Sequence, residues 1–246
     1  MTAAQRAVVV TGGGKGIGRA VVARFAAAGD RVVAVGRDRE ALEATEAAAA
    51  EVCDVTDEGQ VMALFERLGP IGVLINNAGV ATSAPLERTT LDDWRMHWDV
   101  NATGPFLCTR AAIGDMIARG DGRIVTVAST AGLVGSRYTA AYAASKHAAV
   151  GLMRAVAAEV AGTGVTANAV CPTYVRTEMT RRSIAGIVAA TDRSEEEAEA
   201  ALVAASPLGR LLEPDEVAFA VAFFAAPEAA AINGQTLVLD GGGIQA

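Results

Sequence analysis

The sequence predicts an α/β protein in which seven parallel strands form one doubly wound sheet with helices on both faces. Short β-branched runs alternate with longer helical patterns along all 246 residues, and this alternation implies right-handed crossovers between parallel strands. Apolar residues make up 52% of the chain and aromatic residues only 4%, so the core must consist of small and branched aliphatic side chains. No Pro/Ser-rich linker, charge block or internal repeat divides the chain, which predicts a single domain over residues 1–246.

Each predicted strand is a short run with a helical pattern after it. The strands are expected at residues 7–11, 31–35, 52–54, 73–75, 123–128, 165–170 and 236–239. The helices between them are expected at residues 16–28, 39–47, 58–68, 91–119, 138–161 and 213–224. The third strand has the weakest pattern of the seven, because only Val52 and Cys53 separate an alanine-rich helical pattern from Asp54.

Residues 177–207 interrupt the alternation late in the chain. The stretch is basic near its start, at Arg176, Arg181 and Arg182, and acidic later, between residues 195 and 199. Substrate loops project from the carboxyl edge of such sheets, so we expect a helical, mobile lid here.

The net charge and the cysteine spacing argue against two kinds of binding site, a broad nucleic-acid-binding face and a cysteine-based metal site. The net charge of -7 and the sequence pI near 5.0 argue against nucleic-acid binding through a broad basic face, although a local basic pocket for a phosphorylated ligand stays open. Cys53, Cys108 and Cys171 are isolated and without metal-ligand spacing, which predicts reduced buried thiols, no metal site and a cytoplasmic protein. We expect no signal peptide and no membrane span, because no apolar run is long enough.

A glycine-rich loop follows the first predicted strand. Residues 8–18 read VVVTGGGKGIG, in the order strand, loop and helix. Glycines let the backbone turn tightly and approach a pyrophosphate, and the helix start directs unpaired N–H groups at that anion. The spacing differs from G-x-G-x-x-G, and a plain turn is the alternative, but the flanking elements favour dinucleotide binding by Gly12, Lys15, Gly16, Ile17 and Gly18.

The end of the second predicted strand bears on the choice between NADP and NAD. Arg37 follows Gly36 directly and Lys15 lies in the glycine loop, so two cations converge where the NADP 2′-phosphate would lie. An acidic residue here would bind the ribose diol of NAD, and Asp38 is close enough in sequence to reach it. The charges favour NADP(H), with NAD(H) as the alternative.

Tyr142 and Lys146 form the candidate acid–base pair. In a helix, a spacing of four residues puts both side chains on one face, roughly 6 Å apart along the axis. An ordinary phenol has a pKa of about 10, and a nearby ammonium lowers it by favouring the phenolate. The spacing therefore predicts a group that can release and accept a proton near neutral pH.

With the glycine loop, the run Asn76-Asn-Ala-Gly79, Ser129 and Tyr142-x-x-x-Lys146 in this order, the chain resembles the short-chain dehydrogenase/reductases over essentially its whole length. The resemblance implies one NAD(P)-binding Rossmann-type domain, a nicotinamide cofactor, no catalytic metal, and a tetramer or dimer. It also implies that Ser129 holds the substrate oxygen and that Tyr142 donates or accepts the proton. Lys146 would bind the nicotinamide ribose and lower the tyrosine pKa, and Asn101 would hold a proton-relay water.

The resemblance assigns the cofactor wall as well. Asn77, Ala78 and Gly79 would line it, and Asp54 with Val55 would contact the adenine end. Pro172, Val175 and Thr177 would lie over the nicotinamide, where the last two would bind the carboxamide. Two departures stand out: Thr173 occupies the place of a usual glycine, and the helix before Asp54 looks short.

The substrate class is less sharply indicated. Residues 168–172, 177–180 and 206–210 resemble those of 3-oxoacyl-thioester reductases and of the ketoreductases of aromatic polyketide synthesis, and residues 132–138 resemble those of 3-hydroxybutyrate dehydrogenases. We therefore expect an NADP(H)-dependent reductase of a 3-oxoacyl thioester, polyketide or related small ketone. The alternatives are an NAD-dependent secondary alcohol or 3-hydroxy acid dehydrogenase, and a non-catalytic dinucleotide-sensing protein.

Four arginines are candidates for binding an anionic part of the substrate. Arg137 lies near the expected substrate mouth, and Arg176, Arg181 and Arg182 lie on or next to the lid. We hypothesise that one or more of them binds a carboxylate or phosphate, for example on a coenzyme A or pantetheine arm, with a solvated surface as the alternative. A carrier-protein partner is doubtful, because Asp121 interrupts the basic residues beside the fifth strand.

We also expect the chain to assemble with copies of itself. The family implies a homotetramer, with the helices at 91–119 and 138–161 and the last helix and strand pairing around two-fold axes. Trp94 and Trp98 are expected in core or interface packing. His97 and His147 have no spacing that suggests a metal site or a catalytic triad, so no role is assigned to them.

Overall fold

A seven-stranded, wholly parallel sheet forms the centre of the computed structural model, which describes residues 5–204 and 206–245. The strand order is β3-β2-β1-β4-β5-β6-β7, so the winding reverses between β1 and β4. The strands are β1 (Ala7–Thr11), β2 (Arg31–Gly36), β3 (Ala49–Val52), β4 (Val73–Asn76), β5 (Gly122–Val127), β6 (Val165–Pro172) and β7 (Thr236–Leu239). The predicted doubly wound, Rossmann-type fold is confirmed.

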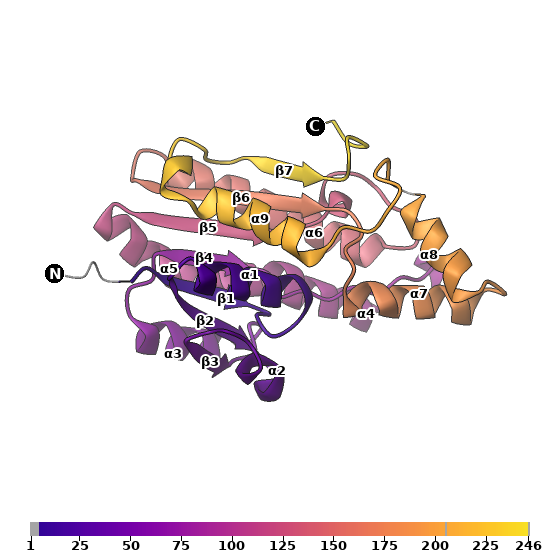
Figure 1. Ribbon diagram of the computed structural model, residues 1–246, viewed down its shortest axis with the longest axis horizontal. Helices are drawn as coiled ribbons and strands as arrows, with labels where there is room; N and C mark the ends of the chain where they lie inside the picture. Colours follow the sequence, from indigo (N-terminus) through magenta and orange to yellow (C-terminus); the bar gives the residue numbers. More distant parts are fainter. Residues whose placement is uncertain (1–4, 205, 246) are drawn as a thin grey trace.

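Helices cover both faces of the sheet (Figure 1). The α-helices are α1 (Gly16–Ala27), α2 (Arg39–Glu43), α3 (Glu58–Leu68), α4 (Leu91–Trp98), α5 (Gly104–Arg119), α6 (Ala140–Glu159), α7 (Glu178–Ala190), α8 (Glu195–Val203) and α9 (Pro214–Ala225). Helices α1 and α9 lie side by side on one face, and α3, α5 and α6 cover the other.

Two aliphatic cores result from the alternation of side chains along each strand. In β1, Val8 and Val10 pack in the core beneath α1 and α9, whereas Val9 packs in the core beneath α3 and α5. Every residue of β1 is buried, as expected for a strand covered on both faces. Packing of aliphatic side chains on both faces therefore stabilises the strand pairing that brings the carboxyl ends of the strands to one edge of the sheet.

The region between β2 and α3 differs from the prediction. The helix expected at 39–47 ends at Glu43, and the strand expected at 52–54 is Ala49–Val52. Ala48 N donates to Val32 O at 2.9 Å, and Ala49 pairs with Val33 in the ladder. Sheet pairing thus overrides the helix propensity of the alanine run.

The helix expected at 91–119 is interrupted in its middle. A π-helical segment, Asp99–Thr103, separates α4 from α5. Such segments displace a single residue from the regular helical face and are frequent at functional sites. Here the segment carries Asn101, one of the predicted site residues.

The lid stretch forms α7 and α8, which project beyond the carboxyl ends of the strands (Figure 1). Ile184, Ala198 and Leu202 form a small apolar cluster of their own between these two helices. Cys53, Cys108 and Cys171 are free and buried, as predicted. Over residues 5–204 and 206–245, no helix is long and apolar enough to cross a membrane.

Candidate active site

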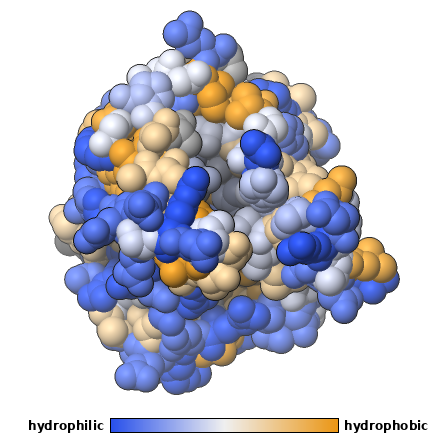
Figure 2. All heavy atoms as spheres, turned by 90° about the vertical axis from the view of Figure 1, so that its right-hand side faces the viewer, coloured by the Kyte–Doolittle hydropathy of each residue, from blue (hydrophilic) through white to orange (hydrophobic). Residues whose placement is uncertain are grey.

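A cavity of about 950 Å³ opens at the carboxyl edge of the sheet. Figure 2 looks onto this edge and shows a hollow whose inner surface is near neutral in hydropathy and whose rim carries strongly hydrophilic side chains. The loops after β1, β2, β4, β5 and β6 line it, together with α7. We call one part of the cavity the cofactor end; it is lined by Gly12, Gly14, Lys15, Gly16, Ile17, Gly36, Arg37, Asp38, Ala41, Leu42, Cys53, Asp54, Val55, Asn77, Ala78 and Gly79. We call another part the substrate end; it is lined by residues 80–83 and 134–139 and by Tyr174, Met179, Thr180, Ser183, Ile187, Leu202 and Ile244.

The glycine loop brings backbone very close to backbone. Gly12 and Gly16 have φ angles of 64° and 52°, which favour glycine. A Cβ on Gly18 would overlap the carbonyl oxygen of Gly12 and lie 2.6 Å from Asn77 Nδ2. Gly18 is outside the set of described residues that line the cavity, so its part is to let the loop close on the start of α1.

Both predicted phosphate-binding cations face carboxylates. Lys15 Nζ lies 2.6 Å from Asp38 Oδ2, and Arg37 lies 3.7 Å from Asp54 Oδ2. The Arg37 side chain is 71% exposed. Exposed ion pairs of this kind are weak and exchange partners readily, so both cations can turn to another anion in the cavity.

Asn77 ties the loops after β1 and β4 together. Its Nδ2 donates to the carbonyl oxygens of Thr11 at 2.9 Å and Gly12 at 3.2 Å. The backbone N–H groups of Asn77 and Ala78 both donate to Thr11 Oγ1. Ala78 and Gly79 line the cavity beside Asn77, so this cross-link fixes the wall opposite the glycine loop.

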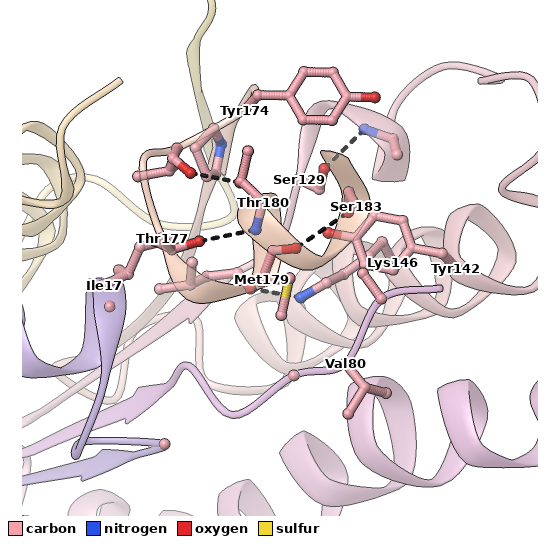
Figure 3. Close-up of a pocket in the computed structure, with 18 of the residues that line it drawn as sticks. Ile17, Val80, Ser129, Tyr142, Lys146, Tyr174, Thr177, Met179, Thr180 and Ser183 are labelled. Atoms are coloured by element: carbon pink, nitrogen blue, oxygen red, sulfur yellow. Dashed lines mark hydrogen bonds between the residues drawn. The ribbon is translucent and has the colours of Figure 1, made fainter. Parts of the chain in front are cut away.

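Tyr142 and Lys146 lie one turn apart on α6, with Lys146 Nζ 5.9 Å from the centre of the Tyr142 ring (Figure 3). Lys146 is buried and donates to Val127 O at 3.0 Å. Burial lowers the pKa of Lys146 to about 8. We expected Lys146 to lower the pKa of Tyr142, and this expectation is wrong. Burial raises the pKa of Tyr142, and a hydrogen bond with Ser129 opposes that rise only in part.

Ser129 lies two residues beyond the last residue of β5 and begins a short 3₁₀ turn. Its Oγ accepts from Ala131 N at 3.1 Å, which leaves the hydroxyl proton free to donate elsewhere. A Cβ on Gly132 would lie 2.8 Å from the Lys146 carbonyl oxygen. The turn therefore packs directly against α6, and this contact sets the position of Ser129 relative to Tyr142.

Asn101 lies behind the cavity wall, outside the set of described lining residues. Its Nδ2 donates to Val80 O at 2.9 Å and Ser145 Oγ at 3.0 Å, and its Oδ1 accepts from Val80 N at 2.9 Å. A Cβ on Gly79 would lie 3.2 Å from Asn101 Oδ1 and 3.6 Å from Lys146 Nζ. The glycine thus lets the loop pass close to both side chains.

The segment after β6 lines the remaining side of the cavity with Pro172, Val175 and Thr177. Thr177 caps α7 by accepting from Thr180 N. Thr173, the departure noted in the sequence, donates its backbone N–H to Leu239 O at 3.0 Å. This bond ties the segment to β7.

His97 is a site residue that the sequence analysis missed. It is 1% exposed and packs edge-on to Tyr142, with ring centres 6.1 Å apart. Its Nδ1 lies 2.7 Å from Asp93 O and its Nε2 lies 3.0 Å from Thr82 N. A carbonyl partner on one nitrogen and an N–H partner on the other require the neutral ring with the proton on Nδ1. The signal available in the sequence was its position four residues before Asn101.

Of the four candidate arginines, only Arg137 is among the described residues that line the cavity. The other three lie outside the described lining of the cavity, and each pairs with a glutamate at the surface. Arg176 pairs with Glu199 and Glu213, and both Arg181 and Arg182 pair with Glu178.

The tryptophans and the basic residues beside β5 lie outside this site. Trp94 and Trp98 stack on each other 6.2 Å apart and are 40% and 42% exposed, so they are not core residues. Arg123 is buried and bonds Asp121, while Arg119 pairs with Asp115. Across the described residues, no cluster of His, Cys, Asp or Glu is suited to a metal ion.

Comparisons with known proteins agree on one group. The family model described as short chain dehydrogenase matches residues 6–188. A galactitol 2-dehydrogenase (L-tagatose-forming) from Cereibacter sphaeroides is 39% identical, over 95% of this chain and 92% of its own length. A D-threitol dehydrogenase from Mycolicibacterium smegmatis is 37% identical, over 96% of this chain and 92% of its own. A solved structure of an actinorhodin polyketide ketoreductase variant with NADPH superposes with a TM-score of 0.91 at 37% identity, covering 97% of both chains.

Proposed function

The chain belongs to the short chain dehydrogenase family of oxidoreductases, and from that premise we propose that it transfers a hydride between NADP(H) and a carbonyl or secondary alcohol carbon. The expected direction is reduction of a 3-oxoacyl thioester, a polyketide or a related small ketone. The observation that carries this proposal is the grouping of Ser129, Tyr142 and Lys146 at one point of the cavity, between the cofactor end and the substrate end.

The chemistry follows from where charge develops. The nicotinamide supplies the hydride, and as the carbonyl carbon accepts it, negative charge grows on the carbonyl oxygen. The hydroxyls of Ser129 and Tyr142 are donors that can stabilise this charge where it forms. Burial raises the pKa of Tyr142, and the protonated phenol is the form that donates a proton in reduction. Lys146 would bind the nicotinamide ribose, and Asn101 would hold a relay water beside it.

The cofactor end suits a dinucleotide phosphate. Gly12, Gly16 and Ile17 would present backbone N–H groups at and before the start of α1 to the pyrophosphate, and Gly18 would let the loop close behind them. Lys15 and Arg37 would exchange their carboxylate partners for the 2′-phosphate of NADP(H). The similar ketoreductase structure with NADPH supports this choice.

The rest of the cofactor assignment follows from the cavity lining. Asp54 and Val55 would contact the adenine, and Asn77, Ala78 and Gly79 would form the wall. Pro172, Val175 and Thr177 would lie over the nicotinamide.

A direct test measures turnover of NADPH and NADH with a panel of oxoacyl thioesters, keto acids and cyclic ketones, and of NADP⁺ and NAD⁺ with polyols and 3-hydroxy acids. Faster ketone reduction with NADPH is the expected result. Faster alcohol oxidation with NAD⁺ would favour the alternative, an NAD-dependent alcohol or 3-hydroxy acid dehydrogenase. That alternative gains support from Asp38, which can reach a ribose diol, and from the two similar polyol dehydrogenases. Cofactor binding without turnover of any substrate would indicate a non-catalytic, dinucleotide-sensing protein.

The same proposal covers architecture and assembly. We take the chain as one domain, with α7 and α8 as the lid over residues 177–207; residue 205 lies outside the described residues. Exposed aromatic side chains on α4 and α9, among them Trp94, Trp98 and Phe219, support association into a homotetramer. The cytoplasmic location stays part of the proposal. Light scattering that shows a monomer at micromolar concentration would contradict the assembly.

A further inference from the structure

Four basic residues line the cavity, and one of them differs from the others. Lys15 and Arg37 pair with carboxylates at the cofactor end, and Lys146 is buried beside Tyr142. Arg137, at the substrate end, has no acidic partner within 4.0 Å among the residues that the structure describes. An unpaired guanidinium beside a substrate cavity is free to bind an anion on the substrate.

Tyr138 holds this guanidinium in place. The Arg137 guanidinium lies over the Tyr138 ring, 5.2 Å from the ring centre, and its NH2 group donates to the Tyr138 hydroxyl at 3.1 Å. Stacking on an aromatic face leaves the edge of a guanidinium available. Because only one N–H is used within this pair, the fork that grips carboxylates and phosphates is still available.

Tyr138 itself adopts a backbone conformation that is costly for its residue type. Its φ is 64°, and it is the one non-glycine residue with positive φ among residues 5–204 and 206–245. Its carbonyl oxygen accepts from Ala84 N at 2.8 Å, so the conformation is held by a bond between the loops on either side of the substrate end. Strain of this kind persists where surrounding structure enforces it, and it concentrates at ligand-binding sites.

The wall of the cavity at the substrate end carries apolar side chains among polar ones such as Thr180 and Ser183. Val134, Tyr174, Met179, Ile187 and Leu202 all line the cavity at the substrate end, and Figure 3 shows Tyr174 and Met179 around the same cavity as Tyr142. Apolar walls favour an apolar substrate body, whereas the rim offers a fixed cation.

We propose that Arg137, oriented by Tyr138, is an anion-binding subsite that selects ketones with an apolar body and a carboxylate or phosphate remote from the carbonyl. This inference rests on the proposed ketone reduction and specifies its substrate class. The guanidinium binds the anionic end by paired hydrogen bonds, while the carbonyl reaches Ser129 and Tyr142.

The test uses matched substrates and matched variants. The substrates are methyl ketones ending in a carboxylate, beginning with levulinate and lengthening by methylenes, with their methyl esters and the corresponding phosphates. The variants are Arg137→Gln, Tyr138→Phe and, as a control arginine outside the cavity, Arg182→Gln. We expect Arg137→Gln to raise the KM of the anionic ketones at least about tenfold, the scale of a charge-assisted hydrogen bond. The KM of the esters and of NADPH should stay within about twofold, and Tyr138→Phe should give a smaller rise.

If Arg137→Gln changes the KM of the acids and of the esters equally, the inference is overturned. Turnover of the esters in that case would still support the proposed ketone reduction. A rise for phosphates but not carboxylates, or the reverse, identifies the anion. If the wild-type enzyme reduces none of these ketones, calorimetry of octanoate binding to the NADP⁺-loaded protein decides: equal affinity of wild type and Arg137→Gln overturns the subsite, and weaker binding to Arg137→Gln supports it.

Discussion

At the cofactor end of the cavity the loop backbone itself is packed and hydrogen-bonded closely, whereas the substrate end is lined mainly by side chains. Gly12, Gly18 and Asn77 bring two loops together through carbonyl oxygens and N–H groups. The substrate end is closed by apolar side chains of α7 and α8 and by the stacked pair Arg137 and Tyr138. Few substitutions fit a closely packed backbone, so the cofactor end is constrained to a single type of ligand. The substrate end can bind a different ligand when its side chains change.

Among the changes that leave Tyr142 in place, the largest effect is expected from a methyl group at the cofactor end. Gly18→Ala puts a Cβ onto the Gly12 carbonyl oxygen, so the loop must move away from the start of α1. NADPH affinity, measured by fluorescence titration, should fall at least about a hundredfold, or about 3 kcal/mol. Gly186→Ala, in α7 with open space around it, is the control and should bind NADPH normally. Normal NADPH binding by Gly18→Ala would show that the backbone contact is not essential.

Replacing Lys146, which lies between the cofactor end and the substrate end, is expected to change stability and activity in opposite directions. Because burial lowers the pKa of Lys146 to about 8, its charge destabilises the folded state. Lys146→Met should therefore raise the free energy of unfolding at pH 7 by about 1–3 kcal/mol while reducing kcat about a hundredfold.

The pH dependence of that difference has a definite sign. Below about pH 8 the lysine is charged in both folded and unfolded chains, so the full penalty is present. As pH rises toward the ordinary lysine value of about 10.4, both states become neutral and the penalty disappears. Chemical denaturation of wild type and Lys146→Met at pH 7 and pH 10 measures the difference in free energy of unfolding between the two proteins. A difference that is the same at both pH values would refute this account.

At the substrate end, His97 tests whether a single hydrogen bond positions the loop at residues 80–83. His97→Leu removes the acceptor for Thr82 N, while His97→Gln retains an acceptor at a similar reach. We expect kcat/KM for ketones to fall about tenfold in the leucine variant, about 1.4 kcal/mol, and to recover in the glutamine variant. NADPH affinity should be unchanged in both. If glutamine and leucine lose the same activity, the ring packs against Tyr142 without acting through Thr82.

The smallest effect concerns the nucleotide preference. Arg37→Gln removes one of two cations from an exposed rim, so the KM of NADPH should rise by about three- to tenfold while that of NADH changes little. Steady-state kinetics with both cofactors, at low and at high salt, measure the shift. Arg39→Gln, in a pair with Glu43, serves as the control. An equal rise for NADH would mean that Arg37 does not read the 2′-phosphate.

The sequence located some elements around the cavity to the residue and misplaced others. The strands Ala7–Thr11 and Thr236–Leu239 were predicted to the residue because continuous aliphatic runs leave little choice of structure. The helix predicted at 39–47 was too long and the strand predicted at 52–54 was too late, because the pairing of Ala49 with Val33 is invisible in local propensity. Local patterns thus reveal contacts that are near in sequence and miss those that the sheet creates.

Side-chain environment was the other limit. The spacing of Tyr142 and Lys146 was correct, but burial, not the neighbouring ammonium, controls the Tyr142 pKa. Arg176, Arg181 and Arg182 were candidates on charge alone. Glu178 lies within four residues of Arg181 and Arg182 on the same helix, whereas the partners of Arg176, Glu199 and Glu213, are distant in sequence. His97 received no role because its partners, Asp93 O and Thr82 N, are backbone atoms.

The central claim is that the Tyr142 phenol donates the proton to an oxygen that gains charge as the hydride arrives. The direct measurement is single-turnover oxidation of bound NADPH by a ketone in wild type and Tyr142→Phe, together with the NADPH dissociation constant of each. We predict a rate loss of at least about a thousandfold, within the range for a positioned general acid, at unchanged NADPH affinity. A phenylalanine variant that reduces the ketone at the wild-type rate would contradict the account.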